Sequence, residues 1–281
     1  MWGKNFEERT GDDMRIDVIE TKITPLDRKV CVRVFLPDGY ETGKKRYPVL
    51  YVNDGQDVFC DEQAFWGAES LRFEQYYRDY GHFLPEVILV AVEAPEDHGE
   101  RTAQYSPFTK DFVVPEGKTF EPHIEGKGVE YLDWMTGELK EQIDRTYRTF
   151  MDADHTGICG YSTGGLISTY AILKYGHIFH RAIIMSAAVC IWMDKLEEVL
   201  KTADCSHIKR LYLDTGTNEF GRMTTKGEFL EGAETICRYF TGHGLTKEIM
   251  KYNVYQDAIH AQREWRLRFP DALRWVFFDG K

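Results

Sequence analysis

Residues 156–165 read Thr156-Gly157-Ile158-Cys159-Gly160-Tyr161-Ser162-Thr163-Gly164-Gly165. Within them, Gly160-x-Ser162-x-Gly164 has the spacing of a nucleophile elbow, the sharp turn between a strand and a helix that holds a serine hydroxyl clear of a sheet. Both flanking positions are glycine because a Cβ there would crowd the turn. We therefore expect Ser162 to be a nucleophile. The backbone N–H of Thr163, at the start of the next helix, is expected to stabilise an oxyanion.

The residues around this motif fit such a turn. Residues 155–159 form a short run typical of a buried strand, and residues 166–175 have helical apolar spacing that ends at Gly176, a common helix C-cap. The alternative interpretation is a glycine-rich turn between a strand and a helix, with an idle serine.

The composition is that of a globular protein with an acidic surface. The chain has 281 residues, of which 43% are apolar and 29% charged, and its net charge is −11. This length is enough for one large core. Nucleic acids and anionic membrane surfaces bind basic patches, so the net charge argues against both as main partners.

Cysteine usage and the N-terminal residues favour a cytoplasmic location. The six cysteines show no CxxC spacing, and several have the apolar neighbours of buried free thiols. Met1–Arg9 contains no apolar signal segment, and no apolar run reaches the length of a membrane span. We expect a cytoplasmic protein that needs no metal or cofactor and whose partner is a small molecule.

Alternating strand and helix patterns predict the fold class. Strands are expected at 17–24, 30–37, 48–53, 85–92, 155–159, 181–186, 209–214 and 248–255. Helices are expected at 63–80, 133–147, 166–175, 194–202, 226–240 and 262–278, the last broken or kinked at Pro270. An antiparallel start followed by repeated β-α units indicates an α/β fold. We expect one domain over 1–281, with about eight strands in a mostly parallel sheet and helices on both faces.

Residues 94–125 form a long polar segment without a clear period. Loops of this length in a compact domain are usually functional or mobile. The aromatic side chains in it favour a pocket wall or lid, and the alternative is a surface loop without a role.

A serine of this kind needs a base, and on this fold the chain order is serine, acid, histidine. Of the nine histidines, only His243 and His260 lie late enough to follow an acid loop comfortably. His243 stands between two glycines at a helix end, where a local role explains it. His260 follows the last strand, at the sheet edge where the elbow opens. It is the predicted base, and a helix cap is the alternative.

Three carboxylates are candidates for the acid that orients this histidine. Glu219 lies in the loop after the strand at 209–214 and is the preferred candidate. Asp214, at the end of that strand, and Asp257, three residues before the histidine, stay open as alternatives.

A second oxyanion donor is expected after an early central strand. Gly55 permits a tight turn there, so the backbone N–H of Gln56 can point inward. A β-turn without a catalytic role explains Asp54-Gly55 equally well.

Taken together, these pieces resemble the Putative esterase family of α/β-hydrolases, which includes esterase D, enterochelin-esterase-like proteins and feruloyl-esterase domains. The resemblance extends from about residue 20 to the C-terminus. The matching pieces are 51–59, Arg101 with Tyr105 and Pro107, 143–149, 160–165, 216–219, and His260 with Trp265 and Leu273. It implies that Ser162, Glu219 and His260 stand at the family's triad positions. The family commonly has Asp in place of Glu219 and Met in place of Thr163.

The leading functional hypothesis is a serine carboxylesterase that works through an acyl-enzyme. An acyltransferase and a non-catalytic binding protein on a hydrolase fold are the alternatives. We expect the substrate pocket to include Gly55, Arg101, Tyr161 and Trp192.

Overall fold

The structure, a computed structural model, describes residues 14–65 and 68–278. The N-terminal stretch Met1–Arg9, where we expect no signal segment, lies outside the described residues. Among the residues that are described, no helix is both long enough and apolar enough to cross a membrane.

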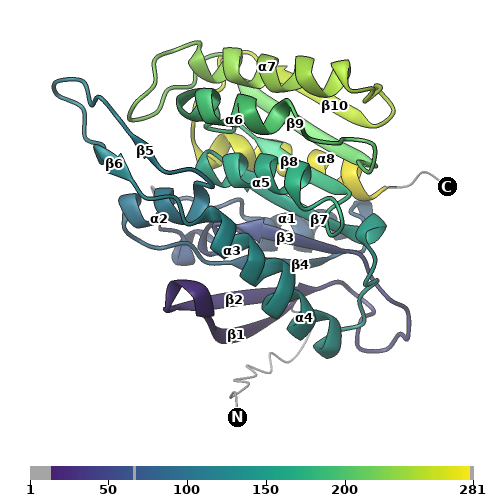
Figure 1. Ribbon diagram of the computed structural model, residues 1–281. Helices are drawn as coiled ribbons and strands as arrows, with labels where there is room; N and C mark the ends of the chain where they lie inside the picture. The colour runs from purple at the N-terminus through teal and green to yellow at the C-terminus, as the bar shows by residue number, and fades with distance from the viewer. Residues whose placement is uncertain (1–13, 66–67, 279–281) are drawn as a thin grey trace.

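One large sheet confirms the predicted fold class (Figure 1). Its eight strands follow the order β1-β2-β4-β3-β7-β8-β9-β10. The strands are β1 (Arg15–Ile23), β2 (Arg28–Leu36), β3 (Val49–Asn53), β4 (Ile88–Val92), β7 (Thr156–Tyr161), β8 (Arg181–Met185), β9 (Arg210–Gly216) and β10 (Met250–Tyr255). The pairs β1–β2 and β2–β4 are antiparallel, and every later pair in the sheet is parallel.

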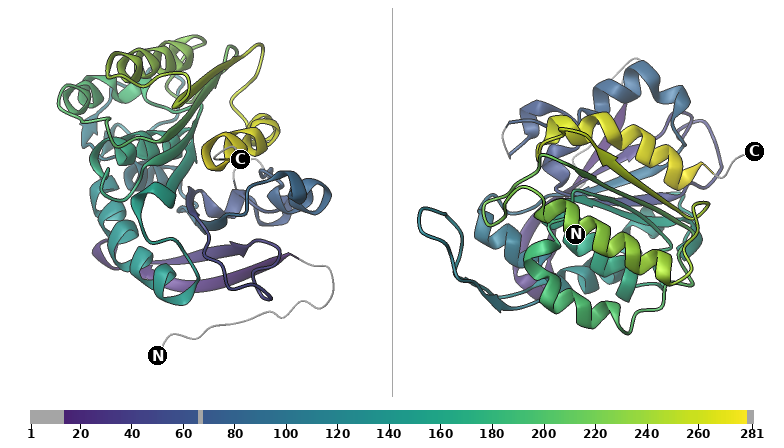
Figure 2. Two further views of the ribbon diagram at one scale, coloured as in Figure 1. Left: turned by 90° about the vertical axis from the view of Figure 1, so that its right-hand side faces the viewer. Right: turned by 90° about the horizontal axis from the view of Figure 1, so that it is seen from above.

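Helices cover both faces of this sheet because its central strands are mostly apolar. Every residue of β3, β4, β7 and β8 is buried, as expected for parallel strands covered on both sides. One face packs against α1 (Phe73–Tyr80) and α8 (Gln262–Phe277). The other face packs against α3 (Gly128–Trp134), α4 (Lys140–Thr146), α5 (Thr163–Lys174), α6 (Met193–Leu200) and α7 (Glu228–Gly242). The left view of Figure 2 shows α8, in yellow, across the sheet from the teal and green helices.

Parallel strands bring distant parts of the chain to one edge. The segments that follow β3, β7, β8, β9 and β10 all leave the sheet at its carboxyl edge, which is where α/β sheets bind ligands. Asp54, Ser162 and Ser186 directly follow β3, β7 and β8, and the loops at 217–227 and 256–261 follow β9 and β10.

The helix expected over 63–80 begins only at Phe73, and residues 66 and 67 of that range lie outside the described part. The Asp61 carboxylate accepts hydrogen bonds from the backbone N–H and hydroxyl of Ser70, and Arg72 has a left-handed φ of 47°. These local contacts hold residues 68–72 in a non-helical path that helical spacing alone does not reveal.

Two other helices differ from expectation. The helix expected at 133–147 begins at Gly128 and passes through a π-helical segment, Met135–Leu139, before α4. The last helix, for which we expected a break or a kink at Pro270, does not break there and extends over Gln262–Phe277. Apolar side chains on one side of this helix, including Trp265 and Leu273, are buried against the sheet. That packing offsets the hydrogen bond lost at the proline.

The segment 94–125 is not a structureless loop. It contains α2 (His98–Tyr105) and a two-stranded hairpin of β5 (Lys110–Asp111) and β6 (His123–Ile124), which projects from the body of the protein in Figure 1. The Asp97 carboxylate caps α2 by accepting the N–H of Glu100 at 2.9 Å. Asp97 and Glu100 have the spacing of a capping box, the local signal that could have revealed this short helix.

Candidate active site

The turn between β7 and α5 holds Ser162 in a strained backbone conformation. Its φ of 56° and ψ of −126° are unusual for a residue with a side chain. Its backbone N–H lies 3.2 Å from the carbonyl oxygens of both Met185 and Ser186, at the end of β8. A Cβ on Gly160 would overlap the backbone carbonyl of Gly164, and one on Gly164 would lie 2.9 Å from a carboxylate oxygen of Asp54. The two glycines therefore permit the close approach that the elbow requires.

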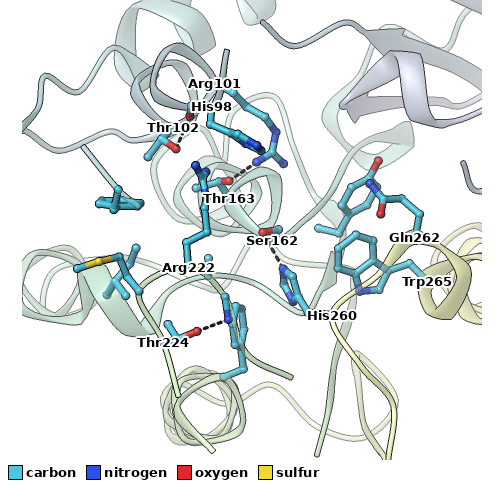
Figure 3. A pocket seen from close by; sticks show the side chains of 17 residues that line it. His98, Arg101, Thr102, Ser162, Thr163, Arg222, Thr224, His260, Gln262 and Trp265 are labelled. Atoms are coloured by element: carbon cyan, nitrogen blue, oxygen red, sulfur yellow. Dashed lines mark hydrogen bonds between the residues drawn. The ribbon is translucent and has the colours of Figure 1, made fainter. Parts of the chain in front are cut away.

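A continuous hydrogen-bonded chain joins Ser162, His260 and Glu219 (Figure 3 shows the first link). His260 Nε2 lies 2.9 Å from Ser162 Oγ, and His260 Nδ1 lies 3.0 Å from Glu219 Oε2. The histidine comes from the loop between β10 and α8, and the glutamate from the loop after β9. With Nδ1 donating to the carboxylate, Nε2 can accept a proton from the serine.

Glu219 is held by bonds to its other oxygen. Oε1 accepts hydrogen bonds from the backbone N–H of Gly216 at 2.7 Å and from the hydroxyl of Ser186 at 2.6 Å. Trp265 Nε1 in turn donates to the oxygen of Ser186 at 2.8 Å. This arrangement orients Glu219 and leaves Oε2 for the histidine. Sequence reasoning gave no part to Ser186, whose only local sign is that it directly follows a buried strand.

The two alternative acids lie elsewhere. The Asp214 carboxylate accepts hydrogen bonds from the Tyr212 hydroxyl at 3.0 Å and from Arg268 at 3.2 Å. Burial raises the pKa of Asp214 to about 7, and the charge of Arg268 opposes that rise. Asp257 is exposed, and its carboxylate accepts a hydrogen bond from the neighbouring Gln256. Neither aspartate has a hydrogen bond to His260 among the described contacts.

Of the two proposed oxyanion donors, Thr163 directly follows Ser162 and lines the cavity beside it, whereas Gln56 does not. Thr163 is the first residue of α5, so its backbone N–H lacks a partner within the helix. Gln56 is the second residue of a 3₁₀ helix, Gly55–Asp57, and its backbone N–H is likewise without an intrahelical partner. Gln56 does not line the pocket beside Ser162, and its side chain accepts the N–H of Ala94 at 3.0 Å. Its role as an oxyanion donor stays a prediction.

A cavity of about 230 Å³ opens beside Ser162 and His260. Its apolar lining includes Phe120, Ile191 and Phe229. The segment 94–125, expected to form a pocket wall or lid, contributes the lining residues His98, Arg101, Thr102 and Phe120.

Two of the four expected pocket residues line this cavity. Arg101 does so: its Nε and Nη2 donate to the two carboxylate oxygens of Asp54 at 2.6 and 2.7 Å, and its Nη1 donates to the Thr163 hydroxyl at 2.5 Å. Tyr161 also lines it, stacked on Trp265 with ring centroids 4.3 Å apart. These contacts place Arg101 directly against the start of the elbow helix.

The other two expected pocket residues, Gly55 and Trp192, lie outside the cavity lining. A Cβ on Gly55 would lie 2.5 Å from the backbone of Ala91, so this glycine serves close packing against β4. The Trp192 ring is fully buried against Phe112, with centroids 5.0 Å apart, and its neighbour Ile191 faces the cavity instead. The short 3₁₀ helix Cys190–Trp192 sets this direction, which the sequence does not specify.

The comparison with known families shows which family the chain belongs to. The profile of the family described as "Putative esterase" matches residues 23–276. The chain belongs to this esterase family. The resemblance inferred from the sequence is thereby confirmed.

Relatives of this esterase-family chain include two bacterial proteins. It is 26% identical over 247 residues to an uncharacterised Bacillus subtilis protein, YbbA, covering 87% of this chain and 91% of that protein. It is 28% identical over 178 residues to "Esterase Rv1288" of Mycobacterium tuberculosis. That match covers 63% of this chain and 33% of the mycobacterial protein, so the chain matches only about a third of its length.

Solved structures of similar fold come from named hydrolases. An IroE-like serine hydrolase from Shewanella oneidensis superposes with a TM-score of 0.69 at 20% identity, covering 95% of this chain and 81% of that one. The enterobactin esterase FES from Shigella flexneri gives 0.70 at 18% identity, with 94% and 58% covered. A ferulic acid esterase gives 0.67 at 17% identity, with 95% and 99% covered. At these identities the likeness shows the α/β fold alone.

Proposed function

We propose that this protein is a serine carboxylesterase that hydrolyses a small carboxylic ester through an acyl-enzyme intermediate. The observation that carries the proposal is the hydrogen-bonded chain from Glu219 through His260 to Ser162, beside a cavity of about 230 Å³. Membership of the esterase family supports the same reaction class.

In the first half of the reaction, Ser162 Oγ attacks the ester carbonyl while His260 Nε2 takes its proton. Negative charge develops on the carbonyl oxygen. In this proposal the backbone N–H of Thr163, at the N-terminus of α5, stabilises it, and the backbone N–H of Gln56 is the second donor. His260 then gives the proton to the departing alkoxide, and the acyl group stays on Ser162.

In the second half, a water molecule attacks the acyl-enzyme and gives its proton to His260. The acid leaves, and the proton returns to Ser162 Oγ. Glu219 remains ionised throughout, since its part is to orient the imidazole and stabilise its positive charge. The bonds from Gly216 and Ser186 hold it in place for that task.

The test is the variant Ser162→Ala. We expect it to keep the fold, measured by circular dichroism and Tm, and to lose p-nitrophenyl ester turnover to near background, by a factor on the order of 10⁶ in kcat when the triad acts as a unit. A fluorophosphonate should label the wild type and not this variant. Ser206→Ala is the matched control, because Ser206 is exposed and lies far along the chain from the elbow. Substantial turnover in Ser162→Ala, or an unlabelled wild type, would reject the proposal.

The substrate is to be found by profiling. The structures of similar fold are named for enterobactin and ferulic acid, which are chemically different compounds, so the fold does not choose between them. A panel of p-nitrophenyl acyl esters, acylated sugars and aryl esters, ranked by kcat/KM, measures the preference. The cavity size favours short acyl groups.

A further inference from the structure

The charge of the cavity lining differs from that of the whole chain. Among the described residues, the lining contains no aspartate or glutamate, but it contains His98, Arg101 and Arg222 in addition to His260. The chain as a whole carries a net charge of −11. A basic lining in an acidic protein is therefore a local feature of this site.

The charges of the two arginines are compensated differently. Arg101 is neutralised by its paired hydrogen bonds to Asp54. Arg222 forms no ion pair with a described carboxylate, and its guanidinium lies 5.8 Å from the centre of the Phe120 ring. Asp97 and Glu121 act on Arg222 only through longer-range attraction. Arg222 thus brings to the cavity a charge that no direct ion pair with a described carboxylate neutralises.

The direction of the Arg222 side chain brings this charge into the site. Figure 3 shows it extending toward His98 and Arg101, across the pocket from Gln262 and Trp265. Burial lowers the pKa of Arg222, and the charge of Arg101 lowers it further. Burial also lowers the pKa of His98, and the positive charges of Arg222 and Arg101 lower it further. An anion between these groups would favour the charged form of each.

We propose that the ester substrate carries a carboxylate, and that Arg222 binds it at the wall of the cavity opposite Trp265. This inference rests on the proposed esterase function and names its substrate class. A guanidinium presents paired donors that match a carboxylate. Because Arg222 belongs to the same loop as Glu219, binding of the anion also holds the loop that orients His260.

The test compares pairs of esters that differ only in this charge. Mono-p-nitrophenyl adipate and p-nitrophenyl adipamate carry a carboxylate or a carboxamide on the acyl side. The butyryl esters of 4-hydroxybenzoate and 4-hydroxybenzamide carry them on the alcohol side. In each pair the measured quantity is the ratio of kcat/KM for the carboxylate to that for the carboxamide. The pair with the higher ratio tells on which side of the ester the anion lies.

We expect a ratio of at least ~10 for one pair in the wild type, the low end for a charge-assisted hydrogen bond, because Arg222 is exposed to solvent. Arg222→Ala should lower that ratio at least ~10-fold, mainly through KM, and Arg222→Lys should keep part of it. The matched control is Lys226→Ala, which removes the same charge from an exposed position of the same loop outside the cavity lining. Lys226→Ala should change this ratio by less than about two-fold relative to the wild type, because salt screens an exposed charge that does not contact the substrate.

Two results would overturn the inference while leaving the esterase function intact. One is equal kcat/KM for carboxylate and carboxamide in both pairs, by a wild type that a fluorophosphonate labels. The other is a ratio in Arg222→Ala that equals the wild-type ratio, which would make Arg222 a solvated surface side chain. A wild type that neither reacts with the fluorophosphonate nor hydrolyses any of the four esters would instead reject the esterase function, and the inference with it.

Discussion

At the scale of single residues, the orientation of the His260 ring depends on one carboxylate group. Glu219 is almost fully buried, and its two oxygens have separate tasks. Oε1 is occupied by Gly216 and Ser186, and Oε2 is left for the histidine. The longer side chain of glutamate, compared with aspartate, lets a loop that leaves β9 at Gly216 reach both groups at once.

Glu219→Gln should lose at least ~10² in kcat, because a carboxamide cannot stabilise the imidazolium and can select the wrong tautomer. Asp257→Asn is the control, since its carboxylate is exposed and should matter less than two-fold. Steady-state kinetics on a p-nitrophenyl ester, with Tm measured for each variant, checks both. Near-normal turnover in Glu219→Gln beside a collapse in Asp257→Asn would transfer the role of acid to the aspartate.

At the scale of elements, the site depends on how closely β7 and α5 approach each other at the elbow. The first turn of α5 passes over the end of β7, with the Gly164 carbonyl facing Gly160 and the Ser168 hydroxyl bonded to that carbonyl at 2.8 Å. The two nearest atoms that a new Cβ on Gly160 would meet belong to the backbone of Gly164, so a rotamer change cannot relieve the overlap.

Gly160→Ala should therefore shift the helix start and displace Ser162 from His260. A displacement of about 1 Å costs on the order of 10²-fold in rate. We expect at least that loss in kcat, with a lower Tm. Gly137→Ala is the control, because a Cβ there meets nothing within 4 Å inside a helical segment, and it should be neutral or slightly stabilising. Full activity in Gly160→Ala would show that the elbow relaxes without moving the serine.

At the scale of the whole molecule, several acidic groups are buried under the site. Asp57 accepts hydrogen bonds from the backbone N–H of Phe65 at 2.9 Å and from Gln262 at 3.2 Å. Burial, with the negative charge of Asp54, raises its pKa from 3.8 to about 7. Between these two pH values the folded protein binds a proton at Asp57 that the unfolded chain has released. Stability from this group is therefore complete below about pH 4 and is lost as the pH rises through about 7.

Asp57→Asn removes this titration while keeping the shape of the side chain. We expect the Tm of the variant, relative to the wild type, to rise by at least ~3 °C between pH 5 and pH 8, since about 1 kcal/mol shifts Tm by a few degrees in a protein of this size. Differential scanning calorimetry at the two pH values measures it. The same Tm difference at both pH values would mean that Asp57 does not titrate in this range.

The sequence by itself determined the features that depend on neighbouring residues. The eight strands of the main sheet were predictable because short apolar runs between turn residues usually form strands in a globular protein. The elbow was predictable because Gly160 and Gly164, each two residues from Ser162, leave the space that this single turn requires. The chain order of serine, acid and histidine narrowed the base to His243 and His260, and the position of His260 after the last strand favoured it.

Only the tertiary structure decided the contacts between distant parts of the chain. His260 lies 41 residues from Glu219 and 98 from Ser162 in sequence, and Asp214 and Asp257 were equally compatible with that order. The late start of α1 and the burial of Trp192 also follow from packing partners far away in the chain. The placement of Arg222 at the cavity does so as well. Local spacing encodes strands, helices and turns, but the separation of two side chains across the sheet is set by how the β-α units pack together.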